Sequence, residues 1–473
     1  MDKLATKGPF GPRFAAAATA ALCSLTGAAA WAQDAAAAAP VFDSGDTAWV
    51  ITAAALVLMM TLPGLALFYG GLVRSKNVLN VLMQCFISAG IAGVLWILIG
   101  YSLAFGDGNA FIGDFSKVGL ASVTLDSVVT NGADRNIPEL IFAMFQGMFA
   151  IITPALILGA VAERMKFSVW VAFITIWLLV VYCPLAHMVW GSEGWIFQSG
   201  AIDFAGGLVV HMSSGFSALV AAIMLGKRRG FGKEPMPPHS LPLCLIGAGL
   251  LWTGWFGFNA GSALAASPLA ALAFLNTSTA ASMAVLVWAA IEWIHRGKPT
   301  ALGGATAAVA GLVAITPACG AVSPLGAMAT GAGVAVISYA ACMFLKPALG
   351  YDDSLDVFGV HALGGAWGAL ASGLFAVSLG DGIESNAQQV LVQLEGIAFT
   401  AVFAPLATAI ILFVLKLFFG SLRVSEEEEI EGLDLSQHSE SAYGFAGGST
   451  IVPELGHVAH GHVSAAAVKR EYA

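Results

Sequence analysis

The chain has 473 residues, of which 58% are hydrophobic and only 10% are charged, and its mean hydropathy is +0.82. Apolar runs of about twenty residues recur between Ala48 and Phe419, and that length spans a bilayer core of about 30 Å. The composition therefore excludes a soluble domain and predicts an all-α polytopic membrane protein, because a helix satisfies its own backbone hydrogen bonds in lipid. The net charge of −9 says little about partners, since five of the 29 acidic residues are clustered in one short segment, SEEEEIEG.

The first 32 residues have the features of a secretory signal peptide. Three basic residues in MDKLATKGPFGPRF precede an alanine-rich stretch, and Ala30 and Ala32 form an A-x-A cleavage site. The alternative interpretation is an additional first span. Cleavage would leave residues 33–45 as a short segment outside the membrane.

The hydropathy pattern then predicts eleven transmembrane helices. The predicted membrane domain covers residues 46–420, and residues 421–473 form a polar tail. The six cysteines show neither paired nor metal-ligand spacing, and the sequence has no Walker or GxGxxG loop, so we expect no metal and no cofactor. In chain order the predicted helices lie at about 46–70, 78–105, 138–162, 167–190, 203–226, 240–262, 268–295, 301–320, 324–346, 359–379 and 389–419.

The charges of the loops predict the orientation of the chain. Lysine and arginine concentrate in alternate loops, whereas the loops between them carry only Lys117 and Arg135. The positive-inside bias places the basic loops in the cytoplasm. With eleven spans, the N-terminus lies outside and the tail from Ser421 lies inside, which agrees with a signal peptide. The basic residues of the predicted cytoplasmic loops are Arg74, Lys76, Arg164, Lys166, Lys227, Arg228, Arg229, Lys233, Arg296, Lys298 and Lys346.

Spans five and ten begin with similar motifs, DFAGGLVVHMSSG and DVFGVHALGG. His211 lies about 12 Å past Asp203, and His361 lies about 7 Å past Asp356, at a helical rise of about 1.5 Å per residue. An unpaired polar group at such depth costs several kcal/mol. Each ring could satisfy the other, with one nitrogen donating and one accepting. The alternative is that each histidine has a purely structural role.

The positions of these two motifs indicate an inverted repeat. Each motif is fifth in a set of five spans, and five is odd, so the two sets insert with opposite topology. The sets are residues 46–226 and 240–379, and the helix at 389–419 lies outside them. Sites of such repeats lie near the membrane midplane. We therefore expect the two histidines to form a site there.

Several segments of the chain, taken together, resemble a known family. PGLALFYGGLVRSKNVLN, FQGMFA, GAVAERMKFS, AHMVWG, DFAGGLVVH, GWFGFNAGSA, TPACG and DVFGVHALGG follow one another between about Asp46 and Tyr443. They strongly resemble the ammonium transporter family, which includes methylammonium transporters and, more distantly, the Rhesus proteins. The resemblance implies eleven helices with a pseudo-twofold axis between spans one to five and six to ten. It also implies a homotrimer with one conduction path in each subunit.

The resemblance also implies roles for particular residues. Without it, Trp190 would be read as an interfacial belt residue and the phenylalanines as core packing. Asp203 corresponds to a structural residue, and a carboxylate at a helix N-terminus caps free N–H groups rather than serving as a ligand. The implied residues are Trp190, Phe145 and Ser262 for recruitment, Phe149 and Phe258 for a gate, His211, His361 and Trp255 for the pore lining and proton relay, and Tyr182 and Thr316 as further residues around the pore.

The implied function is an ammonium transporter or channel and not an enzyme. Aromatic faces and a hydroxyl recruit ammonium, or its analogue methylammonium, at the outer mouth. The proton is removed there, and neutral ammonia crosses an apolar lumen in which imidazoles can relay protons. The alternatives are an ammonium sensor with little transport, a neutral-gas channel for carbon dioxide, and a secondary transporter for a larger solute. The gas channel would need no cation site, and the secondary transporter would need charged residues at the midplane.

The resemblance extends to partners and location. It implies a bacterial inner membrane protein whose cytoplasmic mouth is closed by a trimeric PII-type signalling protein. The tail resembles the family's regulatory tail, with EGLD, a histidine and AY. His438 is followed by Ser439 where the family usually has glycine, so we expect a different local bend. The alternative is a solvated acidic tail that makes no contacts.

Overall fold

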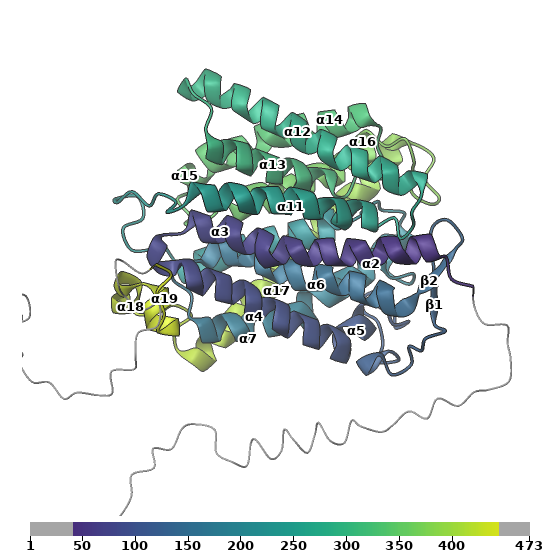
Figure 1. The fold of residues 1–473 in the computed structure, drawn as a ribbon, viewed down its shortest axis with the longest axis horizontal. Helices are drawn as coiled ribbons and strands as arrows, with labels where there is room; N and C mark the ends of the chain where they lie inside the picture. The colour runs from purple at the N-terminus through teal and green to yellow at the C-terminus, as the bar shows by residue number, and fades with distance from the viewer. Residues whose placement is uncertain (1–40, 444–473) are drawn as a thin grey trace, which may run out of the picture. The chain divides into compact units, whose positions relative to one another are not determined.

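The computed structural model describes residues 41–443, so the predicted signal peptide and the last thirty or so residues lie outside the described range. Within that range, long helices run side by side (Figure 1). A short hairpin of β1 (Val128–Thr130) and β2 (Asn136–Pro138) lies at one end of the helices. The tail helices α18 (Glu426–Glu431) and α19 (Leu433–His438) lie at the other. We call these the hairpin end and the tail end.

The helices follow the predicted order. The first set contains α2 (Ser44–Met59), α3 (Ala66–Leu72), α4 (Val78–Leu95), α5 (Tyr101–Phe105), α6 (Glu139–Val161), α7 (Phe167–Trp177), α8 (Cys183–Trp190), α9 (Trp195–Gln198) and α10 (Ser213–Leu225). The second set contains α11 (Leu241–Gly261), α12 (Pro268–Arg296), α13 (Ala301–Ile315), α14 (Pro324–Ala340), α15 (Lys346–Leu349) and α16 (Leu363–Leu374). The helix α17 (Asn386–Phe419) follows outside both sets. Short π-helical segments join several of them, at η1 (Met60–Leu65), η3 (Trp96–Gly100), η5 (Leu178–Tyr182), η6 (Gly207–Met212), η7 (Ala341–Leu345) and η8 (Phe358–Ala362). Two 3₁₀ turns, η2 (Ser75–Asn77) and η4 (Val118–Leu120), complete the helical segments.

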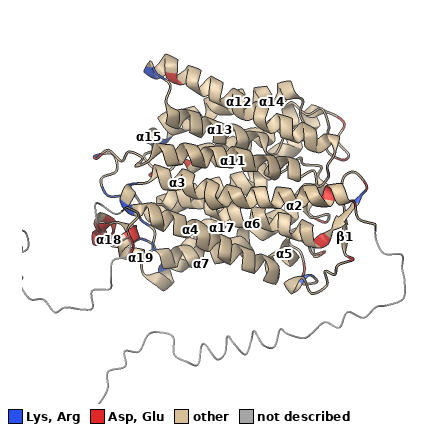
Figure 2. Ribbon diagram, in the orientation of Figure 1, with Lys and Arg blue, Asp and Glu red and all other residues tan. Residues whose placement is uncertain are grey.

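Among the described residues, nine helices are long and apolar enough to cross a membrane. The eighth and tenth predicted spans overlap helices that are shorter. One is α13, and the other is the continuous run of η8 and α16. Charged side chains gather at the two ends of the bundle and are sparse between them (Figure 2). A polytopic all-α membrane protein is therefore confirmed.

Glycine allows the two halves of the bundle to approach closely beside the histidines. A Cβ atom on Gly215 of α10 would overlap the backbone of Ala362, the residue after His361. A Cβ atom on Gly365 of α16 would lie 3.1 Å from the Cβ of His211. Small residues at these crossings replace side-chain contacts with backbone contacts. His211 and His361 each lie in a π-helical segment, η6 and η8, at matching places in the two sets.

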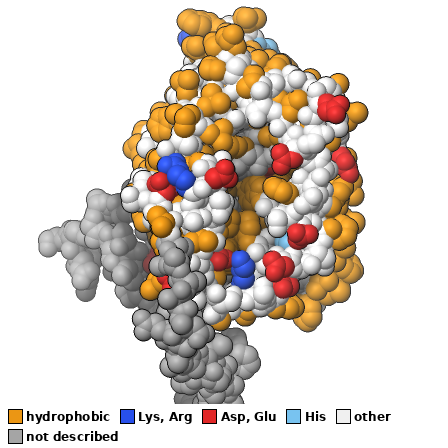
Figure 3. Space-filling model, turned by 90° about the vertical axis from the view of Figure 1, so that its right-hand side faces the viewer, with side chains coloured by type: hydrophobic (Ala, Val, Ile, Leu, Met, Phe, Trp, Pro, Cys, Tyr) orange, Lys and Arg blue, Asp and Glu red, His pale blue; other side chains and the backbone are white. Residues whose placement is uncertain are grey.

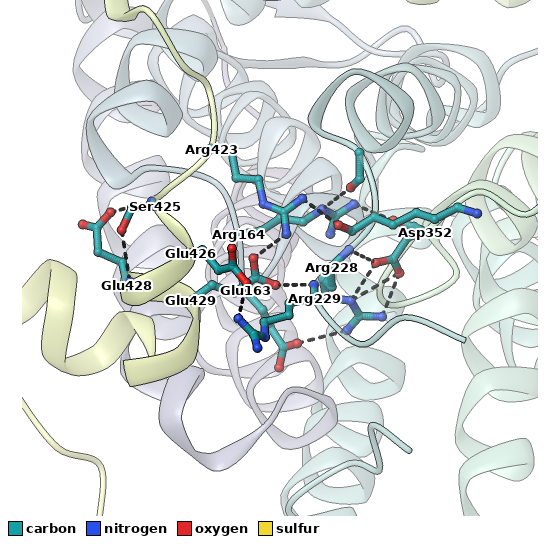
Figure 4. A network of polar contacts seen from close by, with 12 residues as sticks. Glu163, Arg164, Arg228, Arg229, Asp352, Arg423, Ser425, Glu426, Glu428 and Glu429 are labelled. Atoms are coloured by element: carbon teal, nitrogen blue, oxygen red, sulfur yellow. Dashed lines mark hydrogen bonds and ion pairs between the residues drawn. The ribbon is translucent and has the colours of Figure 1, made fainter. Parts of the chain in front are cut away.

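The described part of the tail packs against the tail end of the bundle, so the alternative of a solvated tail without contacts is wrong for residues up to 443. The Leu433 amide donates to Asn77 Oδ1 at 2.9 Å, and the Asn80 amide donates to Asp434 Oδ1 at 2.8 Å. Ser425 caps α18 in a reciprocal capping box with Glu428. Figure 4 shows the glutamates of α18 beside a cluster of arginines that includes Arg228, Arg229 and Arg423.

Candidate substrate pathway

A cavity of about 250 Å³ opens at the hairpin end, where α5 and α8 end and α6 begins. Figure 3 shows the hollow in this face, with hydrophobic side chains inside it. Trp190 is the last residue of α8, and its indole N–H donates a hydrogen bond to the Asp203 carbonyl at 2.8 Å, which holds the ring in place. Ser262 donates its hydroxyl to the Phe258 carbonyl at 2.8 Å, so its oxygen lone pairs remain free to accept. The lining residues are Phe105, Phe142, Gln146, Phe149, Trp190, Phe197, Phe204, Ser262 and Leu264.

Phe145 does not line this cavity, which corrects one of the predicted positions. Its side chain is fully buried behind Phe149, with the ring centroids 5.0 Å apart, and packs against Gly261 of α11. Phe149 takes the predicted place in the cavity wall and meets Trp190 edge to face at 5.9 Å. The two phenylalanines are four residues apart on α6 and so share a helix face. Sequence spacing alone could not show which ring faces the cavity.

Two aromatic rings separate the outer cavity from the interior. The Phe149 and Phe258 rings lie with centroids 4.2 Å apart and planes inclined by 35°. Both side chains are almost fully buried, at 1% exposure each. The structure therefore brings the two predicted gate residues into direct contact, and passage requires at least one ring to move.

A small interior cavity of about 10 Å³ lies beneath the ring pair. That volume is about the size of one water molecule. Its lining is apolar apart from Tyr69, Trp255 and the two histidines, and the Tyr69 hydroxyl is already bonded to the Leu156 carbonyl at 3.0 Å. The cavity thus has room for one very small molecule and offers almost no polar group except imidazole.

The two predicted histidines are in direct contact. His211 Nδ1 and His361 Nδ1 are 3.2 Å apart, and both side chains are buried. His211 Nε2 lies 3.3 Å from Thr316 Oγ1, which also accepts the Trp255 indole N–H at 2.9 Å. Trp255 stacks on the His211 ring at 5.5 Å. The structure therefore brings together four of the predicted residues, including Thr316.

The hydrogen bonds around this pair fix the positions of the protons. Thr316 donates its only hydroxyl proton to the Leu312 carbonyl at 2.8 Å, so it must accept from His211 Nε2–H. A neutral His211 is then an acceptor at Nδ1, and His361 donates from its own Nδ1. His361 Nε2 is left as an acceptor. Thr316 thus orients both rings through a chain of donors and acceptors.

A larger cavity of about 200 Å³ continues from His361 toward the tail end. Its wall combines apolar residues, including Phe68 and Val309, with polar groups such as Thr306 and Asp356. The outer cavity, the ring pair, the histidine cavity and this inner cavity share lining residues in that order. They form one interrupted path along the bundle.

The acidic residue that matches Asp203 in the second repeat is Asp353, not Asp356. Asp203 accepts the amides of the first turn of η6, including Leu208 at 2.9 Å and Val209 at 3.2 Å. Asp353 accepts the Phe358 amide of η8 at 2.8 Å. Each carboxylate lies eight residues before its histidine, since 211 − 203 and 361 − 353 are both 8. Asp356 is instead paired with Lys346 at 2.7 Å.

Tyr182 does not line any of the three cavities on this path. It is fully buried in η5 and packs edge to face on Trp96 at 6.3 Å. Its hydroxyl has no hydrogen-bond partner among residues 41–443. The predicted place for Tyr182 beside the pathway is therefore not what the geometry shows.

These features define a multi-pass membrane protein whose interior path admits only a very small solute. The family model for the Ammonium Transporter Family matches residues 48–443, and the chain belongs to that family. It is 47% identical over 411 residues to an ammonium transporter of Aquifex aeolicus, covering 85% of this chain and 94% of that protein. It is 47% identical over 405 residues to an ammonium transporter of Bacillus subtilis, covering 84% and 98% of the two chains.

Solved structures agree with this assignment. The structure titled Sensor Amt Protein has a TM-score of 0.78 at 30% identity and covers 83% of this chain and 98% of its own. The crystal structure of Candida albicans Mep2 has a TM-score of 0.75 at 36% identity and covers 82% and 88%. The family and these neighbours support ammonium transport as the function of this protein.

Proposed function

We infer that this protein recruits ammonium at the hairpin end, removes a proton there, and passes neutral ammonia along the histidine-lined path. The interior cavity beside His211 and His361 carries this proposal, because it is about 10 Å³ in volume and almost wholly apolar. A bare charge in such a space is expensive, whereas ammonia is neutral and matches water in size. Sodium and potassium cannot become neutral, so the same space excludes them.

Recruitment rests on the outer cavity. The faces of Trp190 and Phe149 attract a cation by their ring quadrupoles, which is worth about 0.5–2 kcal/mol depending on desolvation. Ser262 offers a hydroxyl oxygen with free lone pairs in the same cavity. Together they compensate part of the hydration that ammonium loses on entry. A channel for a neutral gas would have no use for this cation site.

Of the ring nitrogens that line the interior cavity, His361 Nε2 is the one left without a hydrogen-bond partner among residues 41–443. His361 Nε2, as an acceptor, can receive an N–H from ammonia as it passes toward the inner cavity. The proton that ammonium releases returns to the outside, or it crosses the membrane by a separate route through the imidazoles. Asp203 acts at a distance from the substrate, by capping η6 and holding the Trp190 indole through its carbonyl.

The orientation, assembly and partners that the sequence implies belong to the same proposal. The hairpin end faces the periplasm, the tail end faces the cytoplasm, and residues 1–32 are a cleaved signal peptide of an inner membrane protein. Three copies assemble, each with its own path. Lys233, an exposed basic residue in the loop after α10, suits an acidic surface on a PII-type regulator.

Current measurements on purified protein in a planar membrane test the transport step. An ammonium pulse is expected to produce a response that saturates, with no response to potassium. Trp190→Leu removes the cation–π contribution and is expected to raise the half-saturating methylammonium concentration between several-fold and about thirtyfold. An unchanged half-saturating concentration would rule out the outer site.

Alanine variants of the histidines test the lumen. His211→Ala and His361→Ala are each expected to assemble normally and to change the rate or the selectivity against potassium, because each removes the hydrogen bond that the Nδ1 atom of the other ring makes. Normal conduction and selectivity in both variants would contradict the lumen role. Growth of an uptake-deficient strain on scarce ammonium separates transport from sensing, since a sensor would signal without restoring uptake.

A further inference from the structure

A groove of about 410 Å³ lies at the tail end between the last turn of α10 and the end of α15. Its volume is within the range of about 300–1,000 Å³ typical of ligand pockets. The groove takes no part in the substrate path, with which it shares no lining residue. We call it the α10–α15 groove. Its lining residues are Leu219, Ala222, Ile223, Gly226, Lys227, Leu349, Gly350, Tyr351 and Asp352.

The wall of the α10–α15 groove is apolar and faces outward. Ile223 is 61% exposed and Leu349 is 68% exposed, and both lie near the ends of helices that are long and apolar enough to cross a membrane. Side chains of this kind at a span end are in contact with lipid chains when the protein is in a membrane. An acyl chain therefore has an apolar surface to lie on.

Two glycines leave the mouth of the α10–α15 groove open. Gly226 ends α10 with φ +79°, and Gly350 ends α15 with φ +65°. A Cβ atom on either glycine would meet only one cationic atom within 4 Å, Arg423 Nη1 at 3.9 Å for Gly226 and Lys227 Nζ at 3.6 Å for Gly350. The space above both turns is thus empty and lies beside positive charge.

The charge at this mouth is not neutralised locally. Among residues 41–443, no carboxylate lies within ion-pair distance of Lys227, whose ammonium sits 5.6 Å from the Phe231 ring. The acidic wall residue, Asp352, is already bonded to Arg228 at 2.8 Å. Arg423 is bonded to Glu429, but its second nitrogen is turned toward the Lys227 carbonyl. The Lys227 side chain, which has no ion-pair partner among residues 41–443, therefore lies at the mouth of the largely apolar α10–α15 groove, near the membrane boundary.

We propose that the α10–α15 groove binds an anionic phospholipid, with the headgroup phosphate on Lys227 and an acyl chain along Ile223 and Leu349. A long lysine side chain at a span end reaches the headgroup region while its methylenes stay in apolar surroundings. Each such cation near a membrane surface favours anionic lipid by about fivefold. Assigning this lipid to the cytoplasmic leaflet rests on the orientation given in the proposed function, but the binding itself does not.

Lipid binding to the purified full-length protein in detergent tests this site. Phosphatidylglycerol and phosphatidylcholine with identical acyl chains are titrated separately and counted by native mass spectrometry. Lys227→Gln is expected to weaken phosphatidylglycerol binding about three- to tenfold and to leave phosphatidylcholine binding unchanged. Lys227→Arg is expected to retain binding. Lys298→Gln is the matched control, because Lys298 is an exposed lysine in the turn between α12 and α13.

Photo-crosslinking locates the lipid. A phosphatidylglycerol with a photoreactive acyl chain is expected to label peptides containing residues 219–227 and 349–352. Equal losses in Lys227→Gln and Lys298→Gln, or labelling confined to other helices, would overturn the proposal. Displacement of the lipid by soluble glycerol phosphate at matched concentration would also overturn it, because the groove would then recognise a free phosphoester. Neither the lipid titration nor the crosslinking measures transport, so a negative result in them would not affect the proposed function.

Discussion

At the scale of single residues, Thr316 determines how the histidine pair is arranged. Its hydroxyl oxygen accepts from both Trp255 and His211 while its proton goes to the Leu312 carbonyl. The hydrogen bonds then run in one direction: His361 donates to His211, His211 donates to Thr316, and Thr316 donates to the Leu312 carbonyl. The residue is buried, and its neighbours in TPACG give no sign of this role.

Thr316→Val is expected to reduce ammonium transport by about tenfold, or ~1.4 kcal/mol. Valine keeps the shape of threonine but leaves two buried N–H groups without an acceptor, which costs about 1–3 kcal/mol. Uptake of labelled methylammonium by cells and by proteoliposomes measures the change. Thr330→Val is the control, since the Thr330 hydroxyl is equally buried but bonds only the Gly326 carbonyl of its own helix. Equal uptake in the two variants would show that Thr316 does not orient the pair.

At the scale of elements, the histidines are placed by helix crossings that only glycine permits. Gly215 lies four residues after His211, one turn along the same helix, and faces the backbone of Ala362. The π-helical segments η6 and η8 shift the register of their helices just at the two histidines. Such segments are frequent at functional sites. Close crossing and altered register together bring two rings from distant segments to 3.2 Å.

Gly215→Ala is expected to lower the thermal stability of the detergent-solubilised protein and to reduce transport. The new methyl group overlaps backbone atoms that cannot rotate away, and overpacking of this kind costs about 1–3 kcal/mol. Gly304→Ala in α13 is the control, because nothing lies within 4 Å of its added Cβ. That variant is expected to be as stable as the parent or slightly more so, since alanine favours helix. Equal melting temperatures for both variants would contradict the close-crossing argument.

At the scale of the whole molecule, a buried ion network joins segments far apart in the sequence at the tail end (Figure 4). Arg228 bonds Glu163 at 3.1 Å and Asp352 at 2.8 Å, and Arg74 bonds Glu163 at 2.9 Å. Burial raises the pKa of each carboxyl, but for Glu163 the charges of Arg228 and Arg74 outweigh burial and lower its pKa. For Asp352 the hydrogen bonds and charge of Arg228 do the same.

This network predicts a pH dependence with a definite sign. A carboxyl whose pKa is lowered on folding stabilises the fold above its unfolded pKa of about 4, and that stabilisation is lost as the pH falls. Arg228→Gln leaves the buried Asp352 carboxylate without its ion pair and leaves Glu163 with Arg74 alone, and it is expected to cost about 3–5 kcal/mol at pH 7. Protonation relieves that cost, so the gap in melting temperature between parent and variant is expected to narrow from pH 7 to pH 4. Thermal unfolding across that range measures it, and a constant gap would contradict the network.

The tail closes the same end of the molecule. Lys76 donates to the Glu429 carbonyl at 2.9 Å, and Tyr443 bonds His239 at 2.8 Å, next to the inner cavity residue Pro238. Truncation after Ser425 removes α18, α19 and all these contacts. We expect a folded protein with reduced transport and no block by a PII-type protein, whereas the full-length form is blocked. Full activity after truncation, together with no PII binding to the full-length form, would refute both expectations.

The sequence by itself determined the all-α membrane class and the chain order of the main helices, because apolar runs of span length have no other stable form in a membrane. It also identified His211 and His361 as partners, since a titratable ring at matching depth in two repeats needs a partner. Motifs that resemble the family predicted Trp190, Ser262 and the phenylalanine pair, and the structure places these along one path.

Only the tertiary structure decided the choices that depend on side-chain direction. Phe145 and Phe149 share a helix face, and packing against Gly261 turned one ring inward and left the other in the cavity wall. Asp353 and Asp356 are equally plausible in the sequence, but only the first reaches the free amides of η8. Packing and hydrogen bonding in the folded chain set these outcomes, and the local sequence pattern carries no information about them.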